Sequence, residues 1–243
     1  MTKAGYVSLV GAGPGDPGLI TLRGVEALKK ADVVLYDRLV TKEILQYAKP
    51  DAEMVYVGKG CGNHSMPQDD INRLLIEYAQ RGNHVVRLKS GDPYVFGRGG
   101  EETEELEKAG IPYEVIPGIT AAIAAGAYCG LPLTKRGVSS CLTLVTGHED
   151  PTKDHSDVNW AALAQSKGTI VIYMAMAHLD RLVSKLIASG FAADTPGAVI
   201  SNATTPQQKT ITGKLQDLAK LAKEHNLAPP SVIVIGEVVQ IRQ

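Results

Sequence analysis

The sequence predicts an α/β protein of two small domains with a ligand cleft between them. The first domain is expected to contain a mainly parallel sheet and the second a mixed sheet. Three observations predict this class. Short apolar runs alternate with helical patterns along the chain, which is typical of parallel strands covered by helices. Glycine-rich turns directly follow two of these runs, and the alternation breaks once near the middle before it resumes.

The first half of the chain predicts five strands and five helices. Nearly continuous apolar runs, the pattern of strands buried on both faces, place strands at 7–10, 33–36, 54–57, 85–88 and 114–116. Helical patterns cover residues 22–30, 42–48, 68–80, 101–108 and 120–129. We therefore predict a first domain over residues 1–130.

The second half begins after an interruption at residues 131–138, where glycine, proline and adjacent charges predict a linker. A second domain is expected over residues 139–243. Its strands are expected at 142–146, 170–173, 198–200, 208–212 and 232–235, and its helices at 160–165, 179–188 and 215–224. The segment 208–213 has the pattern of an antiparallel hairpin partner, so the second sheet should be mixed.

Composition excludes several classes of protein. The 243 residues are 44% hydrophobic and 21% charged, as in an ordinary globular protein. The three cysteines form no C-x-x-C pair, so neither zinc nor a disulfide framework is indicated. No apolar run reaches transmembrane length and no signal peptide is evident, which predicts a cytoplasmic protein without a membrane partner. A net charge of −1 argues against a nucleic-acid partner.

The two glycine-rich turns predict a ligand site, because open α/β sheets bind ligands at the carboxyl ends of their strands. The first turn, residues 11–17, reads GAGPGDP, and the second, residues 90–93, reads SGDP. The dinucleotide fingerprint fails, since its third glycine position is Asp16 and since Pro14 and Pro17 lack an N–H donor. A loop poor in donors suits a ligand that is not a phosphate.

Basic residues gather in or near the predicted loops and make a polyanionic small molecule plausible. Solvated surface charge is the alternative for each of them taken singly. The residues are Arg23, Arg38, Lys59, Arg87, Lys89, Arg98, Lys135 and Arg136.

Taken together, the motifs resemble the tetrapyrrole methylase family, over nearly the whole chain from Tyr6 to Val239. The main ones are 11–17, 36–40 (YDRLV), 58–59 (GK), 90–93, 96–102 (FGRGGEE) and 117–121 (PGITA). The run at 96–102 narrows the resemblance to the branch that methylates uroporphyrinogen III on the way to sirohaem and cobalamin.

The resemblance implies a homodimeric methyltransferase with a tetrapyrrole substrate. S-adenosylmethionine would be the methyl donor and S-adenosylhomocysteine the product. Two methyl groups would be placed on pyrrole carbons to give precorrin-2. The alternatives are a methylase of the same fold that acts on a later precorrin or another substrate, and a ligand-binding module without activity.

The resemblance also implies the catalytic pair. Asp37 would be the base that takes the proton released after methylation, or would stabilise the cationic intermediate. Lys59 would be the proton donor. The alternatives are that Asp37 caps the helix that follows it and that Lys59 neutralises substrate carboxylates.

The remaining site residues are assigned in the same way. The cofactor would contact Pro14, Ser90, Gly91, Asp92, Val95, Thr120, Ala121, Met174, Ala203 and Ser231. Substrate carboxylates would contact Arg38, Arg98, Gly99, Gly100 and Arg136. Plainer interpretations remain open: Gly91 as an ordinary turn glycine, Thr120 and Ala121 as a helix start, and Met174 as core filler. No histidine lies at metal-ligand spacing, so no metal is expected.

Overall fold

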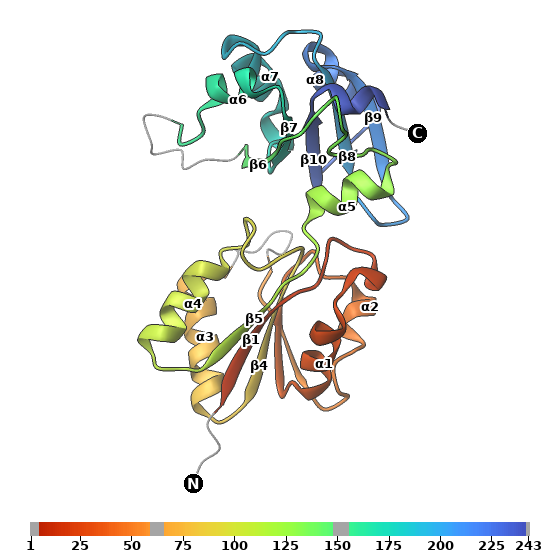
Figure 1. The fold of residues 1–243 in the computed structure, drawn as a ribbon. Coiled ribbons are helices and arrows are strands. Elements are labelled where there is room, and N and C mark those ends of the chain that lie inside the picture. Colours follow the sequence, from red (N-terminus) through yellow and green to blue (C-terminus); the bar gives the residue numbers. More distant parts are fainter. Residues whose placement is uncertain (1–4, 59–65, 148–155, 242–243) are drawn as a thin grey trace. The chain divides into compact units, whose positions relative to one another are not determined.

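The chain forms two compact units in the computed structural model, which describes residues 5–58, 66–147 and 156–241 (Figure 1). The units are Met1–Thr120 and Ala121–Gln243. The division falls earlier than the expected domain end at residue 130. The helix that follows Thr120 belongs to the second unit because Ala122 and Ala125 pack in that unit's core. Residues 131–138 therefore connect two elements of the second unit, where an inter-domain linker was expected.

The sheet of the first unit is entirely parallel. It has five strands in the order β3-β2-β4-β1-β5. The strands are β1 (Tyr6–Gly11), β2 (Val33–Tyr36), β3 (Glu53–Tyr56), β4 (His84–Lys89) and β5 (Tyr113–Ile116). The prediction of a parallel sheet is confirmed.

Helices cover both faces of this sheet (Figure 1). One face carries α1 (Leu22–Lys30) and α2 (Lys42–Leu45), and the other carries α3 (Gln68–Gln80) and α4 (Gly99–Lys108). A short 3-10 turn, η1 (Pro17–Leu19), precedes α1. The α1 helix begins where the Thr21 side chain accepts the Gly24 N–H, the usual cap of a helix start.

The sheet of the second unit is mixed, as predicted. Its five strands have the order β6-β7-β10-β8-β9, with β6 parallel to β7 and the other pairs antiparallel. The strands are β6 (Leu142–Thr146), β7 (Thr169–Tyr173), β8 (Pro196–Ser201), β9 (Lys209–Lys214) and β10 (Ser231–Ile235).

Two layers of helices enclose the second sheet. One core contains α6 (Trp160–Ser166), α7 (Leu179–Ala188) and α8 (Leu218–Glu224), and the other contains α5 (Ala121–Tyr128) and the 3-10 helix η4 (Glu237–Ile241). Short 3-10 turns, η2 (Met176–His178) and η3 (Leu215–Asp217), precede α7 and α8. Across the described ranges, every helix is too short or too polar to span a bilayer.

Topology gathers loops at one edge of each sheet. In the first unit the carboxyl ends of β1, β2, β4 and β5 share an edge because all strands are parallel. In the second unit the carboxyl ends of β7 and β8 lie beside the amino end of β10, since β10 runs antiparallel to both. We call these the first edge and the second edge. Both are the positions where α/β sheets present ligand-binding loops.

A polar cluster is buried near the opposite end of the first sheet. The His84 ring stacks on Tyr6, with its centroid 4.0 Å from the tyrosine ring centroid. Ser8 Oγ lies 3.0 Å from His84 Nε2 and donates to Glu114 Oε1 at 2.9 Å. Burial lowers the pKa of His84 below its ordinary value of 6.5.

This cluster predicts a loss of stability in acid. The folded state binds a proton at His84 less tightly than the unfolded chain does. The contribution of neutral His84 to the unfolding free energy is therefore complete above the unfolded-state pKa, and it falls as the pH drops toward the folded-state pKa. We expect the unfolding free energy to decrease between about pH 7.5 and about pH 5.5, and His84→Gln to weaken this dependence. Urea titrations check it, with the exposed His225→Gln as control. Identical pH dependence in wild type and His84→Gln would contradict it.

Candidate functional site

Three loops of the first edge are joined by backbone hydrogen bonds and by the side chain of Asp92. The Ala12 N–H donates to Lys89 O at 2.8 Å, which fastens the loop after β1 to the end of β4. Gly13 and Gly91 exchange two hydrogen bonds, of 3.2 and 2.7 Å. The Gly118 N–H in the loop after β5 donates to Asp92 Oδ2 at 3.0 Å. We call this contact of the loops after β1, β4 and β5 the three-loop junction.

The junction requires glycine at its centre. A Cβ on Gly118 would lie 2.2 Å from Gly91 O, and a Cβ on Gly11 would lie 2.5 Å from Gly118 N. Gly91 has a φ of 70°, in the left-handed region that favours glycine. Packing therefore requires glycine at positions 11 and 118, and the backbone conformation favours glycine at position 91. Pro14 and Ser90, both predicted cofactor contacts, are half-buried beside the junction.

Asp92 holds two of the three loops together. Its Oδ1 accepts the Tyr94 N–H at 2.8 Å, while Oδ2 accepts the Gly118 N–H. The resemblance implies that Asp92 contacts the cofactor. The structure adds that this half-buried carboxylate fixes the backbone around the first edge.

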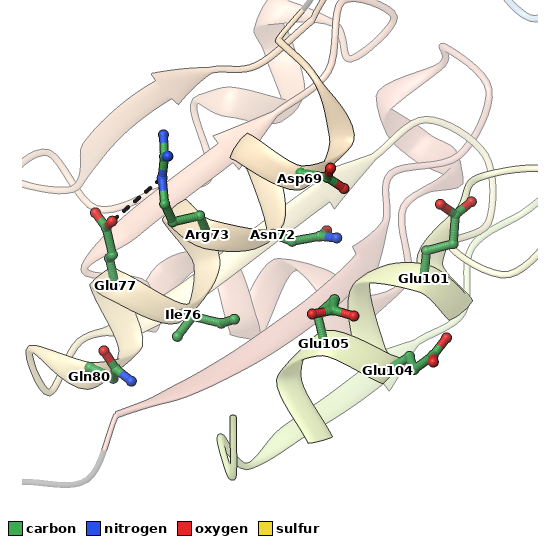
Figure 2. Close-up of a pocket in the computed structure, with 9 residues that line it drawn as sticks. All are labelled: Asp69, Asn72, Arg73, Ile76, Glu77, Gln80, Glu101, Glu104 and Glu105. Carbon is green, nitrogen blue, oxygen red and sulfur yellow. Dashed lines mark ion pairs between the residues drawn. The ribbon is translucent and has the colours of Figure 1, made fainter. Parts of the chain in front are cut away.

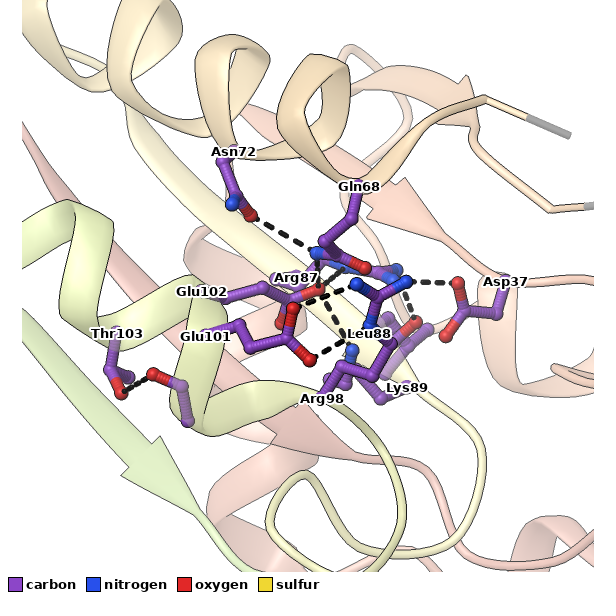
Figure 3. Close-up of polar contacts among 11 residues, drawn as sticks. Asp37, Gln68, Asn72, Arg87, Leu88, Lys89, Arg98, Glu101, Glu102 and Thr103 are labelled. Atoms are coloured by element: carbon purple, nitrogen blue, oxygen red, sulfur yellow. Dashed lines mark hydrogen bonds and ion pairs between the residues drawn. The ribbon is translucent and has the colours of Figure 1, made fainter. Parts of the chain in front are cut away.

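Asp37 directly follows β2 and is held by a buried ion network (Figure 3). Arg87 Nη2 donates to Asp37 Oδ1 at 2.6 Å, and Arg87 Nε donates to Glu102 Oε1 at 3.0 Å. Lys89 Nζ donates to the same Glu102 oxygen at 2.9 Å. The side chain of Asp37 is 30% exposed and that of Glu102 is 0% exposed. Asp37 is thus the member of the network that reaches the surface.

The network corrects two expectations from the sequence. Arg87 and Lys89 are buried and paired, so they are not free surface cations for a polyanion. The alternative role of Asp37 as a helix cap is wrong, because α2 begins after Thr41 and the Asp37 carboxylate is taken by Arg87.

Burial and neighbouring charges act differently on the two cations. Burial opposes the charged form of Arg87, yet Glu102 and Asp37 keep its pKa raised. Burial, followed by the charge of Arg87, lowers the pKa of Lys89, although Glu102 opposes this. The guanidinium of Arg87 therefore remains a cation beside Asp37.

The loop before α4 carries an exposed arginine. Arg98 has a φ of 59°, unusual for a residue with a side chain, and precedes the first helical residue, Gly99. Its guanidinium forms two hydrogen bonds with Glu101, at 2.9 and 2.7 Å. Those bonds raise the pKa of Arg98. Strained backbone at an exposed cation is a common property of ligand sites.

The two glycines of this loop differ. A Cβ on Gly99 would lie 2.4 Å from Pro93 O, whereas one on Gly100 would meet nothing within 4 Å. Gly99 is therefore required by packing, and Gly100 leaves the start of α4 open. Val95 is half-buried in the same loop, and Arg38 is exposed next to Asp37.

The second edge brings together three predicted cofactor contacts. Met174 directly follows β7, and Ala203 comes shortly after β8. Ser231 begins β10 and pairs in register with Ser201, next to the pairing of Val232 with Tyr173. Since Met174 is 53% exposed with a φ of 55°, its interpretation as core filler is wrong.

The start of α5 is fastened to this second edge. The Ala122 N–H donates to the Tyr173 hydroxyl at 2.9 Å, at the end of β7. Ala121 begins the helix, and Thr120 before it is buried. Among predicted substrate contacts, Arg136 is exposed on a turn closed by the Lys135–Ser139 bridge. Lys59 lies outside the described residues, so its role stays a prediction.

A groove of about 570 Å³ lies elsewhere, between α3 and α4 (Figure 2). Its lining is mostly acidic and contains none of the predicted site residues. The side chains are Asp69, Asn72, Arg73, Ile76, Glu77, Gln80, Glu101, Glu104 and Glu105. Within the described ranges no group of three or more His, Cys, Asp or Glu side chains could hold a metal ion. The expectation of no bound metal stays a prediction.

Sequence reasoning missed Glu102 and the pairing of Arg87 with Asp37. A signal was present: Arg87 interrupts an apolar strand predicted to be buried, Lys89 follows it directly, and buried cations need carboxylate partners. The carboxylate that pairs with both cations is Glu102, which reaches them because α4 packs on β4. Local sequence patterns do not encode this tertiary contact.

Fold, loops and motifs define a methylase of tetrapyrrole rings. The family model for Tetrapyrrole (Corrin/Porphyrin) Methylases matches residues 6–219, and the chain belongs to this family. It is an S-adenosylmethionine-dependent methyltransferase.

Within the family, the chain is similar to uroporphyrinogen-III C-methyltransferases. It is 52% identical to the one from Methanocaldococcus jannaschii, over 98% of each chain. It is also 50% identical to a siroheme synthase from Pseudomonas fluorescens, of which it spans 52% of the length. The structure of the Thermus thermophilus uroporphyrin-III C-methyl transferase complexed with S-adenyl homocysteine has a TM-score of 0.83 and 38% identity, covering 97% of this chain and 99% of that one.

Proposed function

We propose that this chain transfers two methyl groups from S-adenosylmethionine to pyrrole carbons of uroporphyrinogen III, giving precorrin-2. The observation that carries the proposal is Asp37, a carboxylate at the first edge that is held by Arg87 and remains partly exposed. Membership of the chain in the tetrapyrrole methylase family supports the substrate class. Homodimerisation and a cytoplasmic location are part of the same proposal.

Each edge, taken by itself, carries residues that suit part of a cationic methyl donor. Asp37 and Asp92 give the first edge two half-buried carboxylates, and Pro14 and Val95 add apolar contact. On the second edge Met174, Ala203 and Ser231 offer a mostly apolar surface suited to an adenine ring. When bound, the donor supplies a methyl group on a positively charged sulfur.

The chain's own residues carry the rest of the reaction. An electron-rich pyrrole carbon needs positioning more than activation, which rigid loops provide, and proximity alone can contribute about 7–11 kcal/mol. Attack leaves the pyrrole cationic. Asp37, oriented by Arg87, stabilises this cation and accepts the proton that the cationic intermediate releases. Lys59 keeps, within this proposal, the role of proton donor that the family resemblance implies.

Anaerobic incubation with S-adenosylmethionine and uroporphyrinogen III tests the proposal, with mass analysis of the tetrapyrrole. We expect the addition of two methyl groups. No methylation, in a protein that still binds S-adenosylmethionine, would overturn the substrate and direct attention to a later precorrin.

Arg98 should bind a substrate carboxylate in place of Glu101. Arginine forms paired hydrogen bonds with carboxylates that lysine cannot reproduce. We expect Arg98→Lys to raise the KM for uroporphyrinogen III by roughly tenfold with little change in kcat. Steady-state kinetics at fixed S-adenosylmethionine measures both. Arg73→Lys, a surface arginine paired with Asp70, is the control, and an equal KM in the two variants would contradict the role.

A further inference from the structure

Glu102 is a buried carboxylate that no part of the reaction uses. It lies in the first turn of α4 and is completely inaccessible to solvent. Its Oε1 accepts hydrogen bonds from Arg87, Lys89 and Gln68, at 3.0, 2.9 and 3.2 Å. Over the part of the chain that the structure describes, its Oε2 has no hydrogen-bond partner. All its contacts are therefore concentrated on one oxygen, the one that faces the cations.

Arg87 connects this buried carboxylate to the surface. Its guanidinium uses Nε for Glu102 and Nη2 for Asp37, so the two carboxylates bind different nitrogens of one planar group (Figure 3). A guanidinium fixed at one nitrogen has a fixed direction at the other, because the group is planar and rigid. The orientation of Asp37 thus depends on what holds Arg87 Nε.

Glu102 also connects Asp37 to the Arg98 loop. Arg98 precedes α4 and Glu102 belongs to its first turn, so the buried ion pairs fix the start of that helix against β4. The loop proposed to bind substrate and the carboxylate proposed to take its proton therefore share one anchor.

We propose that Glu102 is a positioning residue for methyl transfer, acting through Arg87 to orient Asp37. This role rests on the proposed function, in which Asp37 contacts the substrate. Charge balance is the competing explanation, since Arg87 and Lys89 together need two carboxylates. The experiment must hold charge constant while it removes the acceptor oxygen.

Two double variants do this. Lys89→Met with Glu102→Gln removes one positive and one negative charge and keeps an oxygen that can accept the Arg87 Nε hydrogen. Lys89→Met with Glu102→Met removes the same charges and leaves no acceptor. We expect the variant with Glu102→Gln to keep kcat within about twofold of wild type. We expect the variant with Glu102→Met to have a kcat lower by roughly tenfold or more, because misplacement of a reacting group by about 1 Å can lower the rate about a hundredfold. The affinity for S-adenosylmethionine, measured by calorimetry, should be equal in both.

Equal kcat in the two folded double variants would overturn the proposal and leave charge balance as the role of Glu102. If either fails to fold, Arg87→Lys replaces it. A lysine cannot bond both carboxylates through a rigid plane, so kcat should fall while the melting temperature stays within the range of the control, Glu105→Gln on the exposed face of α4.

A second readout separates this proposal from the function on which it rests. Carbon-13 NMR titration of the Asp37 carboxyl, assigned by its disappearance in Asp37→Asn, reports its surroundings without any turnover. A titration curve that differs between the two double variants supports the link from Glu102 to Asp37 even if the substrate proves to be another tetrapyrrole. Identical curves would contradict the link even if methylation of uroporphyrinogen III is observed.

Discussion

Replacing Asp37 by asparagine lowers kcat for methylation by roughly 10²- to 10⁴-fold, the range expected for loss of a positioned proton acceptor. Asparagine keeps an oxygen for Arg87 Nη2 and nearly the same shape, so the network and the fold should survive. What disappears is the negative charge that faces the cationic pyrrole. The affinity for S-adenosylmethionine should change little by comparison.

Single-turnover kinetics with mass analysis distinguishes this result from a slow product release. Asp51→Asn, an exposed carboxylate of the same unit, is the matched control and should be indistinguishable from wild type. Full activity in a folded Asp37→Asn would remove Asp37 from the mechanism. The proton would then have to leave through another group of the site or through water.

Replacing Gly118 by alanine destabilises the first unit by about 2–4 kcal/mol, by analogy with overpacking that also weakens a buried hydrogen bond. The added Cβ would lie 2.2 Å from Gly91 O and 2.7 Å from Gly11 C. Both obstacles are backbone, so no side-chain rotation relieves them. The loops after β1 and β4 must separate, and binding of S-adenosylmethionine should weaken with them.

Gly100→Ala is the control for this experiment. Its Cβ meets nothing within 4 Å and it lies inside α4, where alanine is preferred over glycine. Its melting temperature should equal or exceed that of the wild type. Thermal melts with and without S-adenosylmethionine compare the two variants. A Gly118→Ala protein as stable as Gly100→Ala would show that the junction adapts at little cost.

Much of the fold was predictable because it depends on local patterns. The strands buried on both faces are continuous apolar runs, and the hairpin character of residues 208–213 correctly indicated a mixed second sheet. The helix after Thr120 was assigned to the first domain because it continues the alternation of strands and helices. The helix belongs to the second unit because it packs against the second sheet, and the local sequence pattern does not indicate that contact.

The site was predictable in its loops and less so in its charges. Glycine turns at strand ends identified two of the three loops of the junction, and the contacts between the loops became visible only in the structure. The basic residues were harder, because the predicted strand at 85–88 could indicate that Arg87 is buried but not which carboxylate pairs with it. Arg87 is buried in an ion network and Arg98 is exposed, and the packing of α4 on β4 supplies a carboxylate that pairs with Arg87.

The three-loop junction also restricts how such a site can be altered. Residues 11–13, 91–92 and 118 are far apart along the chain, yet each loop's backbone is the contact surface of the others. A loop transplanted alone from a relative with a different turn would meet two unchanged neighbours shaped for the original. Grafting to change the specificity of this enzyme should therefore exchange the three segments as one unit, and insertions belong in the Arg98 loop beside the open Gly100.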